Sequence, residues 1–256
     1  MSKLLSAMLN LQELEVHARS DNPLTRMHPV IKVIITLIYI LAMTSLGKYE
    51  LSRALLFGVL PILFINLADI PYSVIAKKLM IPLLFGISLG LFNPLYDQST
   101  YVTFGSIPIS GGFISLFTIV IKALFSISMT LLLVSVTTIE AIGSAMSMLK
   151  VPKLIIVLLL IMYRYIIVFL DEIEKTLEAY SLRVNNKRGL HISTWGSLMG
   201  QIILRSYHRS EVLFEAMQLR GFDSMYRMKK VKPLSTSDML AMISCSVIIL
   251  VLRFIP

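Results

Sequence analysis

Apolar runs long enough, or nearly long enough, to cross a lipid bilayer dominate this sequence. Four lie near residues 30–47, 53–69, 79–96 and 111–136, and a fifth occupies 238–254. A hydrocarbon core about 30 Å thick needs about 20 helical residues, because each residue adds about 1.5 Å. Hydrophobic residues make up 56% of the chain and charged residues only 15%, a balance unsuited to a soluble domain. We therefore predict an all-α integral membrane protein with about five transmembrane helices.

The basic residues indicate how the chain is oriented. Lys and Arg number 24 against 15 Asp and Glu. Nucleic-acid binding would need a soluble basic module with interleaved aromatic residues, and none is visible in the sequence. In membrane proteins, Lys and Arg accumulate on the cytoplasmic side. This rule predicts a cytoplasmic N-terminus and a cytoplasmic 69–79 loop carrying Lys77 and Lys78. The 47–53 and 93–110 connections and Pro256 are then expected outside.

The run at 154–170 has the hydropathy of another span but contains Arg164. If it crossed the bilayer, residues 171–236 would lie outside although they hold eleven Lys and Arg. We therefore expect 154–170 to lie at the membrane boundary or beneath other helices. The resulting scheme has a four-span domain over 1–136, a cytoplasmic region over 137–236 and a C-terminal transmembrane helix over 237–256. The exact number of spans around 154–170 stays open.

The cytoplasmic region is predicted to contain two long helices. One runs from Pro152 to Arg183, after a shorter amphipathic piece near 137–149, and the other runs from about Ser193 to Arg220 before a stop at Gly221. The second helix carries two pairs of small residues four apart, a spacing that permits close approach of another helix. These pairs are Gly196 with Gly200 and Ser206 with Ser210. The pattern predicts that the two helices cross, and the alternative is that the small residues are incidental.

The sequence offers little catalytic or metal-binding chemistry. It lacks a GxxxxGKS or GxxxxGKT phosphate loop, and its histidines are scattered over separate segments: His17, His28, His191 and His208. Asp69 and Glu140 fall at span ends, which disfavours a proton-driven carrier. Lys122 lies inside the fourth run and is costly there unless it is paired or packs against a partner. We expect no catalytic residue, metal or bound cofactor, with a membrane enzyme or secondary carrier as the less favoured alternatives.

The two predicted cytoplasmic helices resemble a specific family. YRYIIVFLDEIEKTLEAYSLR followed by SYHRSEVLFEAMQLRGF resembles the paired coupling helices of the T components of energy-coupling-factor (ECF) transporters, most closely the cobalt/nickel branch. The N-terminal NPLTRMHPVIK resembles the beginning of that family's first membrane helix. The similarity extends over most of the chain.

The resemblance implies which residues contact partners. Each coupling helix of that family ends in a short arginine-centred motif that docks into a groove of a cytoplasmic ATPase subunit, and the arginines here would be Arg183 and Arg220. The second motif fits well through Ala216, Leu219 and Gly221. The first, with Leu182 before the arginine, lacks the family's usual small neighbours.

The resemblance also implies the role of the whole chain. It would be a non-catalytic transporter subunit in the cell membrane of a prokaryote. Its partners would be two ATP-binding cassette ATPase subunits, which use the ATP, and a separate substrate-binding membrane S component, dedicated or shared. The chain would transmit ATP-driven motion to that component. The substrate would be cobalt or nickel ion, with a vitamin-type ECF importer as the alternative.

Overall fold

The computed structural model describes residues 22–96, 100–104, 107–183, 192–222 and 235–254, which form two compact units. The first, called the bundle unit, holds the described residues up to Ala145 together with the C-terminal helix. The second, called the crossed-helix unit, holds the described residues from Met146 to Phe222. Helix α9 (Ile139–Met148) contains the boundary between them.

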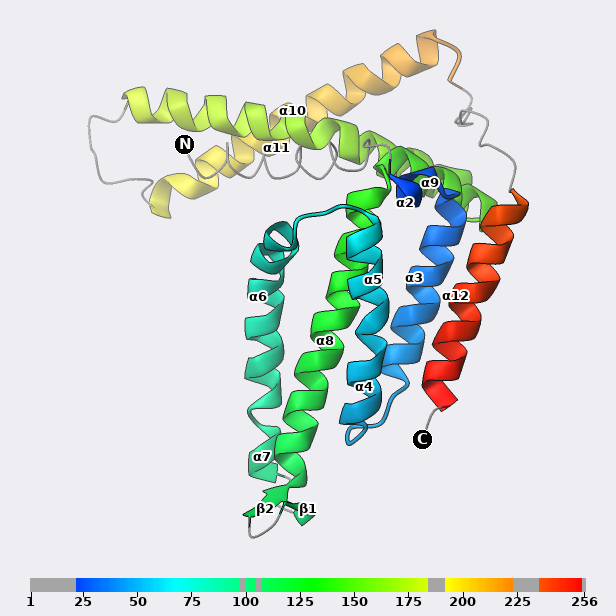
Figure 1. Ribbon diagram of the computed structural model, residues 1–256. Helices are drawn as coiled ribbons and strands as arrows, with labels where there is room; N and C mark the ends of the chain where they lie inside the picture. Colours follow the sequence, from blue (N-terminus) through cyan, green and yellow to red (C-terminus); the bar gives the residue numbers. More distant parts are fainter. Residues whose placement is uncertain (1–21, 97–99, 105–106, 184–191, 223–234, 255–256) are drawn as a thin grey trace. The chain divides into compact units, whose positions relative to one another are not determined.

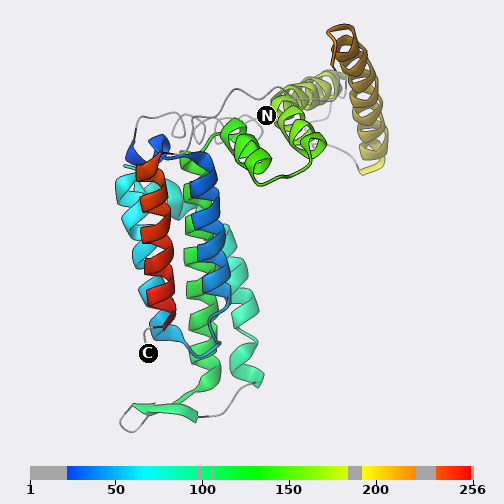
Figure 2. The same ribbon diagram turned by 90° about the vertical axis from the view of Figure 1, so that its right-hand side faces the viewer.

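The bundle unit is built around one long central helix, α8 (Gly111–Val136). This helix contacts four apolar helices of the first half of the chain: α3 (Pro29–Thr44), α4 (Leu51–Phe57), α5 (Val59–Leu67) and α6 (Tyr72–Gly90). The last helix, α12 (Thr236–Phe254), packs against α3 and α4, so helices from the first and last parts of the described chain share one bundle (Figures 1 and 2). Short elements complete it: α2 (Pro23–Arg26), α7 (Asn93–Tyr96) and an antiparallel hairpin of β1 (Thr100–Phe104) and β2 (Ile107–Ser110).

The structure confirms an all-α integral membrane protein. Four helices of the described chain are long and apolar enough to cross a membrane: α6, α8, α12 and α10 (Lys153–Arg183) of the crossed-helix unit. Helix α3 and the segment Leu51–Leu67 are apolar but shorter. The 16 residues of α3 extend about 24 Å, somewhat less than a hydrocarbon core of about 30 Å. The length and composition of α10 are those of a span, so its placement at the membrane boundary stays a prediction from the charge of the residues that follow it.

The third predicted span has different boundaries in the structure. It was expected over 79–96, whereas α6 covers Tyr72–Gly90, so Lys77 and Lys78 belong to the helix and not to a loop. A long lysine side chain can follow an apolar helix surface and still bring its ammonium group to the membrane interface. The hydropathy pattern therefore placed the beginning of the span directly after Lys77 and Lys78, although the helix begins before them. The hairpin within the 93–110 connection was not predicted.

The second predicted span is interrupted at Gly58, which lies between α4 and α5. Pro61 has no N–H with which to bond the carbonyl of Phe57, four residues earlier. The hydroxyl of Tyr39 on α3 donates a hydrogen bond to that carbonyl instead, at 3.0 Å, and both aromatic side chains are fully buried. A Cβ atom at Gly58 would overlap the ring of Phe125 on α8, so glycine is required for this close approach.

Lys122, whose role the sequence left open, has a partner within the chain. Its Nζ donates to the carbonyl of Leu46, just beyond the end of α3. Arg253 near the end of α12 reaches the same place, donating to the carbonyl of Ser45 at 3.1 Å and to the carboxylate of Glu50 at 3.2 Å. The last carbonyls of a helix lack partners inside the helix and carry partial negative charge, so cations are favoured there. Lys122 thus pairs a carbonyl in the segment that directly follows α3.

Candidate functional site

The crossed-helix unit contains two long helices, α10 and α11 (Ile192–Leu219), which cross in Figure 1. At the crossing, the guanidinium of Arg205 donates to the carboxylate of Glu172 at 2.8 Å and to the hydroxyl of Thr176 at 3.4 Å. Thr176 is buried, as are Leu198 and Ile202 of α11. The side chain of Arg205 thus joins the two helices at their crossing.

The predicted small residues contribute less to this crossing than their spacing suggests. A Cβ atom added at Gly196 or Gly200 would meet nothing among the described residues within 4 Å. The hydroxyls of Ser206 and Ser210 donate to carbonyls of their own helix, those of Ile202 and Tyr207. The described residues therefore leave open space around both glycines, whereas Ser206 and Ser210 line a cavity together with Met162 and Phe169 of α10. Small residues permit a close approach of another helix but do not impose one.

A groove with basic residues lies beside the crossing. Its outer part, called the Arg220 groove, has a volume of about 290 Å³ and is lined by residues of both helices: Tyr165, Arg209, Val212, Leu213, Ala216, Met217 and Arg220. An adjoining cavity of about 510 Å³ shares four of these residues and extends to Phe169 and Arg205. The Arg220 groove thus combines apolar walls with two arginines, and the adjoining cavity adds Arg205 together with its partner Glu172.

The structure confirms that Gly221 ends α11. Gly221 has a left-handed backbone with φ of +76°, and its N–H donates to the carbonyl of Gln218 at 2.9 Å. The N–H of Phe222 donates to the carbonyl of Met217 at 3.0 Å, which completes a Schellman cap. The cap holds the backbone of Arg220 at the helix end while its side chain is exposed. Leu219 beside it is 90% exposed.

The corresponding end of α10 is described only in part. Arg183 is the last residue of α10, but its side chain lies outside the part that the structure describes. Leu182, which precedes it, is 82% exposed. The predicted partner-binding residues therefore lie at two helix ends, and the structure places Ala216 and Arg220 together in one groove.

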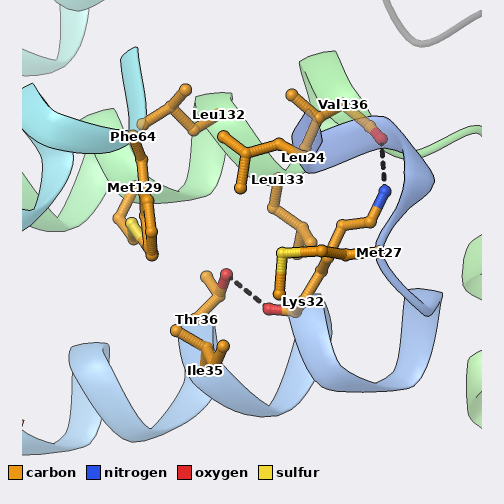
Figure 3. Close-up of a pocket in the computed structure, with 10 residues that line it drawn as sticks. All are labelled: Leu24, Met27, Lys32, Ile35, Thr36, Phe64, Met129, Leu132, Leu133 and Val136. Atoms are coloured by element: carbon orange, nitrogen blue, oxygen red, sulfur yellow. Dashed lines mark hydrogen bonds between the residues drawn. The ribbon is translucent and has the colours of Figure 1, made fainter. Parts of the chain in front are cut away.

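The N-terminal motif NPLTRMHPVIK forms a second polar centre, in the bundle unit. Asn22 and Thr25 bond each other at the beginning of α2, and the side-chain amide of Asn22 donates to the carbonyl of Ala68. Lys32 on α3 is buried, and its Nζ donates to the carbonyl of Val136 at 2.8 Å beside a small apolar cavity of about 30 Å³ (Figure 3). Neither this contact nor the Glu172–Arg205 pair was predicted, because each joins residues from distant parts of the sequence.

Comparison with known proteins agrees with this architecture. The sequence model of the CbiQ family, described as cobalt transport protein, matches residues 20–231. Two proteins of Methanocaldococcus jannaschii, both described only as uncharacterized, are similar over most of the chain. One is 25% identical over 220 residues, which cover 82% of this chain and 74% of the relative, and the other is 27% identical over 226 residues, which cover 85% and 82%. Because the family match includes the first four apolar segments and both crossing helices, this chain belongs to the cobalt transport protein family.

Proposed function

We propose that this chain is the transmembrane coupling subunit of an ECF-type importer for cobalt or nickel ions. Two ATP-binding cassette ATPases would bind the ends of α10 and α11 on the cytoplasmic side of a prokaryotic cell membrane. A separate membrane S component would hold the ion. The chain itself would carry no catalytic step and would bind no cofactor. Membership of the cobalt transport protein family supports transport and this choice of cargo.

The observation that carries the proposal is the exposed end of α11. Arg220 offers a guanidinium at a fixed helix end, next to Arg209 in the Arg220 groove and beside the almost fully exposed Leu219. A carboxylate accepts two parallel hydrogen bonds from a guanidinium, and apolar side chains left in water are typical of protein contact surfaces. Leu182 is exposed in the same way next to Arg183. The two helix ends therefore suit two acidic grooves on partner proteins.

The crossing explains how motion would pass between partners. The Glu172–Arg205 pair and the buried Thr176 join the helices near the middle of α11. A partner that moves Arg220 would therefore shift α10 together with α11, as in rigid-body switching. The first half of α10 exposes Leu154, Leu158 and Met162, an apolar surface that lipid or the S component would cover.

Replacing Arg183 and Arg220 together by alanine tests the proposal. Each charge-assisted contact is worth about 1.5–3 kcal/mol, so each single change should weaken ATPase binding roughly 10-fold to 150-fold. The double variant should lose both the co-purifying ATPases and the uptake of radiolabelled cobalt or nickel, while membrane insertion persists. Arg220→Glu should be worse than Arg220→Ala, because it adds repulsion against an acidic groove.

Lys175→Ala is the matched control, since Lys175 is an exposed cation of α10 that pairs with Asp171 at 2.8 Å. It should leave both measurements near the unchanged chain, because an exposed pair contributes little. Normal ATPase association and normal uptake in the double arginine variant would contradict the coupling role.

The proposal also requires residues 171–236 to face the cytoplasm. A cysteine introduced at Asn185, in a chain whose native Cys245 is replaced by serine, should react with an impermeant thiol reagent only after the membrane is opened. Asn185 lies outside the described residues, so this experiment rests on the eleven basic residues of the segment. Labelling from the external side of intact cells would refute the topology and the coupling role together.

A further inference from the structure

The bundle unit contains a cavity with charged and polar residues in its lining that the coupling role does not use. It has a volume of about 630 Å³ and lies where the N-terminal ends of α3, α9 and α12 meet, beside the short helix α2. Its lining includes His28 and Pro29 of α3, Thr138 and Ala141 of α9, and Ser235 and Asp238 of α12. Binding sites for small ligands have volumes of about 300–1,000 Å³, so this cavity, called the three-helix cavity, has a suitable size.

The electrostatic environment of the three-helix cavity favours an anion. The helices that meet there have 16, 10 and 19 residues, and the N-terminus of each carries partial positive charge and backbone N–H groups without helical partners. Arg26 and Lys32 add two cationic side chains to the lining. Of the described lining residues, only Asp238 carries a carboxylate, and its oxygens accept the N–H groups of His28 and Ser235, each at 3.4 Å. Among the described lining residues, two cationic side chains thus accompany one carboxylate.

A buried hydroxyl in the wall lacks a partner. Thr137, which follows the last residue of α8, lines the three-helix cavity and is only 3% exposed. Its Oγ1 is buried and has no hydrogen-bond partner among the described residues. Buried hydroxyls are nearly always paired, because leaving one unpaired costs free energy. Because Thr137 lines the cavity, rotation of its side chain about the Cα–Cβ bond would turn the hydroxyl toward an acceptor oxygen held there.

Lys32 supplies a second donor in the same wall. Its buried ammonium donates to the carbonyl of Val136 at 2.8 Å and to that of Thr25 at 3.3 Å. An ammonium has three N–H groups, so these bonds leave one for a ligand. Figure 3 draws the bond to the carbonyl of Val136 in a view of the small apolar cavity, which Lys32 also lines. The third donor, the guanidinium of Arg26, lies on an exposed side chain of the lining.

We propose that the three-helix cavity binds a phosphate group, with the Thr137 hydroxyl, the Lys32 ammonium and the Arg26 guanidinium as its donors. A tetrahedral phosphate presents several acceptor oxygens in different directions, which matches donors that come from separate elements. The group would belong either to the headgroup of an anionic phospholipid or to soluble phosphate. The inference is independent of the coupling role, because none of these residues belongs to α10 or α11.

Binding to the delipidated full chain in neutral detergent tests this inference. In one arm, radiolabelled inorganic phosphate is measured by equilibrium dialysis. In the other, native mass spectrometry compares phosphatidic acid with the diacylglycerol that has the same acyl chains and lacks only the phosphate. Saturable binding is expected in at least one arm: binding of phosphatidic acid alone indicates a lipid headgroup, and binding of inorganic phosphate alone indicates a soluble ligand.

Two variants and two matched controls locate the site. Thr137→Val keeps the side-chain shape but removes the hydroxyl, and Arg26→Gln removes an exposed charge, so each should weaken binding about tenfold. Thr137→Ser keeps the hydroxyl, and Lys48→Gln removes a charge beyond the opposite end of α3; both should bind as the unchanged chain does. Three outcomes would overturn the proposal. The first is no saturable binding in either arm, and the second is equal binding of phosphatidic acid and diacylglycerol without binding of inorganic phosphate. The third is equal affinity in all four variants.

Discussion

Replacing Tyr39 by phenylalanine should destabilise the bundle unit through the loss of a single hydroxyl. That hydroxyl donates to the carbonyl of Phe57 at 3.0 Å, in a place where both side chains are fully buried. Pro61 has no N–H with which to bond this carbonyl. Leaving a buried carbonyl without its donor costs about 1–3 kcal/mol, and the retained ring limits any loss of packing. We therefore expect the free energy of unfolding to fall by about 1–3 kcal/mol.

The same reasoning predicts how Pro61 changes the effect. Pro61→Ala supplies an N–H that can donate to the carbonyl of Phe57 along the helix. Tyr39→Phe should then cost less in the Pro61→Ala background, by about 1 kcal/mol, the worth of one typical hydrogen bond. Pro61→Ala also removes buried side-chain atoms, so its own cost must be measured separately as one side of a double-mutant cycle.

The free energy of unfolding can be measured on the purified chain by titrating a denaturing detergent into neutral micelles. Tyr72→Phe is the matched control, since the hydroxyl of Tyr72 donates to the side chain of Asn66 in an exposed position. Its loss should cost much less, because water replaces the partner. If Tyr39→Phe cost no more than Tyr72→Phe, or cost the same with and without Pro61, the account of the interrupted second span would be refuted.

Two further changes test the ends of the helices. Limited burial raises the pKa of Glu50, but the N–H of Gly47 and the guanidinium groups of Arg53 and Arg253 outweigh it and hold the pKa below its ordinary value of 4.5. The stabilisation by Glu50 is therefore complete above about pH 4.5 and is lost as the pH falls through the lower folded-state pKa, so Glu50→Gln should flatten the acid limb of an unfolding titration. Gly221→Ala should weaken co-purification of the ATPases more than Gly221→Asn does. The left-handed backbone at φ of +76° costs most residues about 1–2 kcal/mol, and asparagine tolerates it better. Equal losses in the two variants would argue against the cap as the feature that positions Arg220.

Much of the fold follows from periodicity and hydropathy. The long helices of the crossed-helix unit were expected over 152–183 and from about 193 to 220, and the structure has them at Lys153–Arg183 and Ile192–Leu219. Their apolar residues recur at helical spacing, and proline and glycine mark two of their four ends. The beginning of α6 and the break at Gly58 were not predicted. The first depends on how two lysine side chains lie on a helix, and the second depends on a tyrosine from another helix.

Some features of the candidate site could also be predicted from the sequence and others could not. The position of Arg220 could be predicted, because a glycine directly after an arginine at the end of a helical pattern is a local signal. The pairing of Glu172 with Arg205 could not be predicted, since it depends on the angle at which two helices cross. The three-helix cavity could not be predicted either, because His28, Thr137 and Asp238 meet only after α3, α8 and α12 have packed. A local signal thus identified the end of α11, whereas sites between helices require the packed bundle.

The structure also changes which basic residues indicate topology. Lys32 donates to the last carbonyl of α8, while Lys122 and Arg253 donate to carbonyls just beyond α3. In an apolar surrounding an unpaired carbonyl costs several kcal/mol, so these cations have a structural reason to lie where they do, whichever side of the membrane they are on. They should therefore be left out of a count that orients the chain. The eleven basic residues of 171–236 include none of the three, but Arg205 has a structural partner in Glu172, so the cytoplasmic prediction for that segment rests on its ten other basic residues.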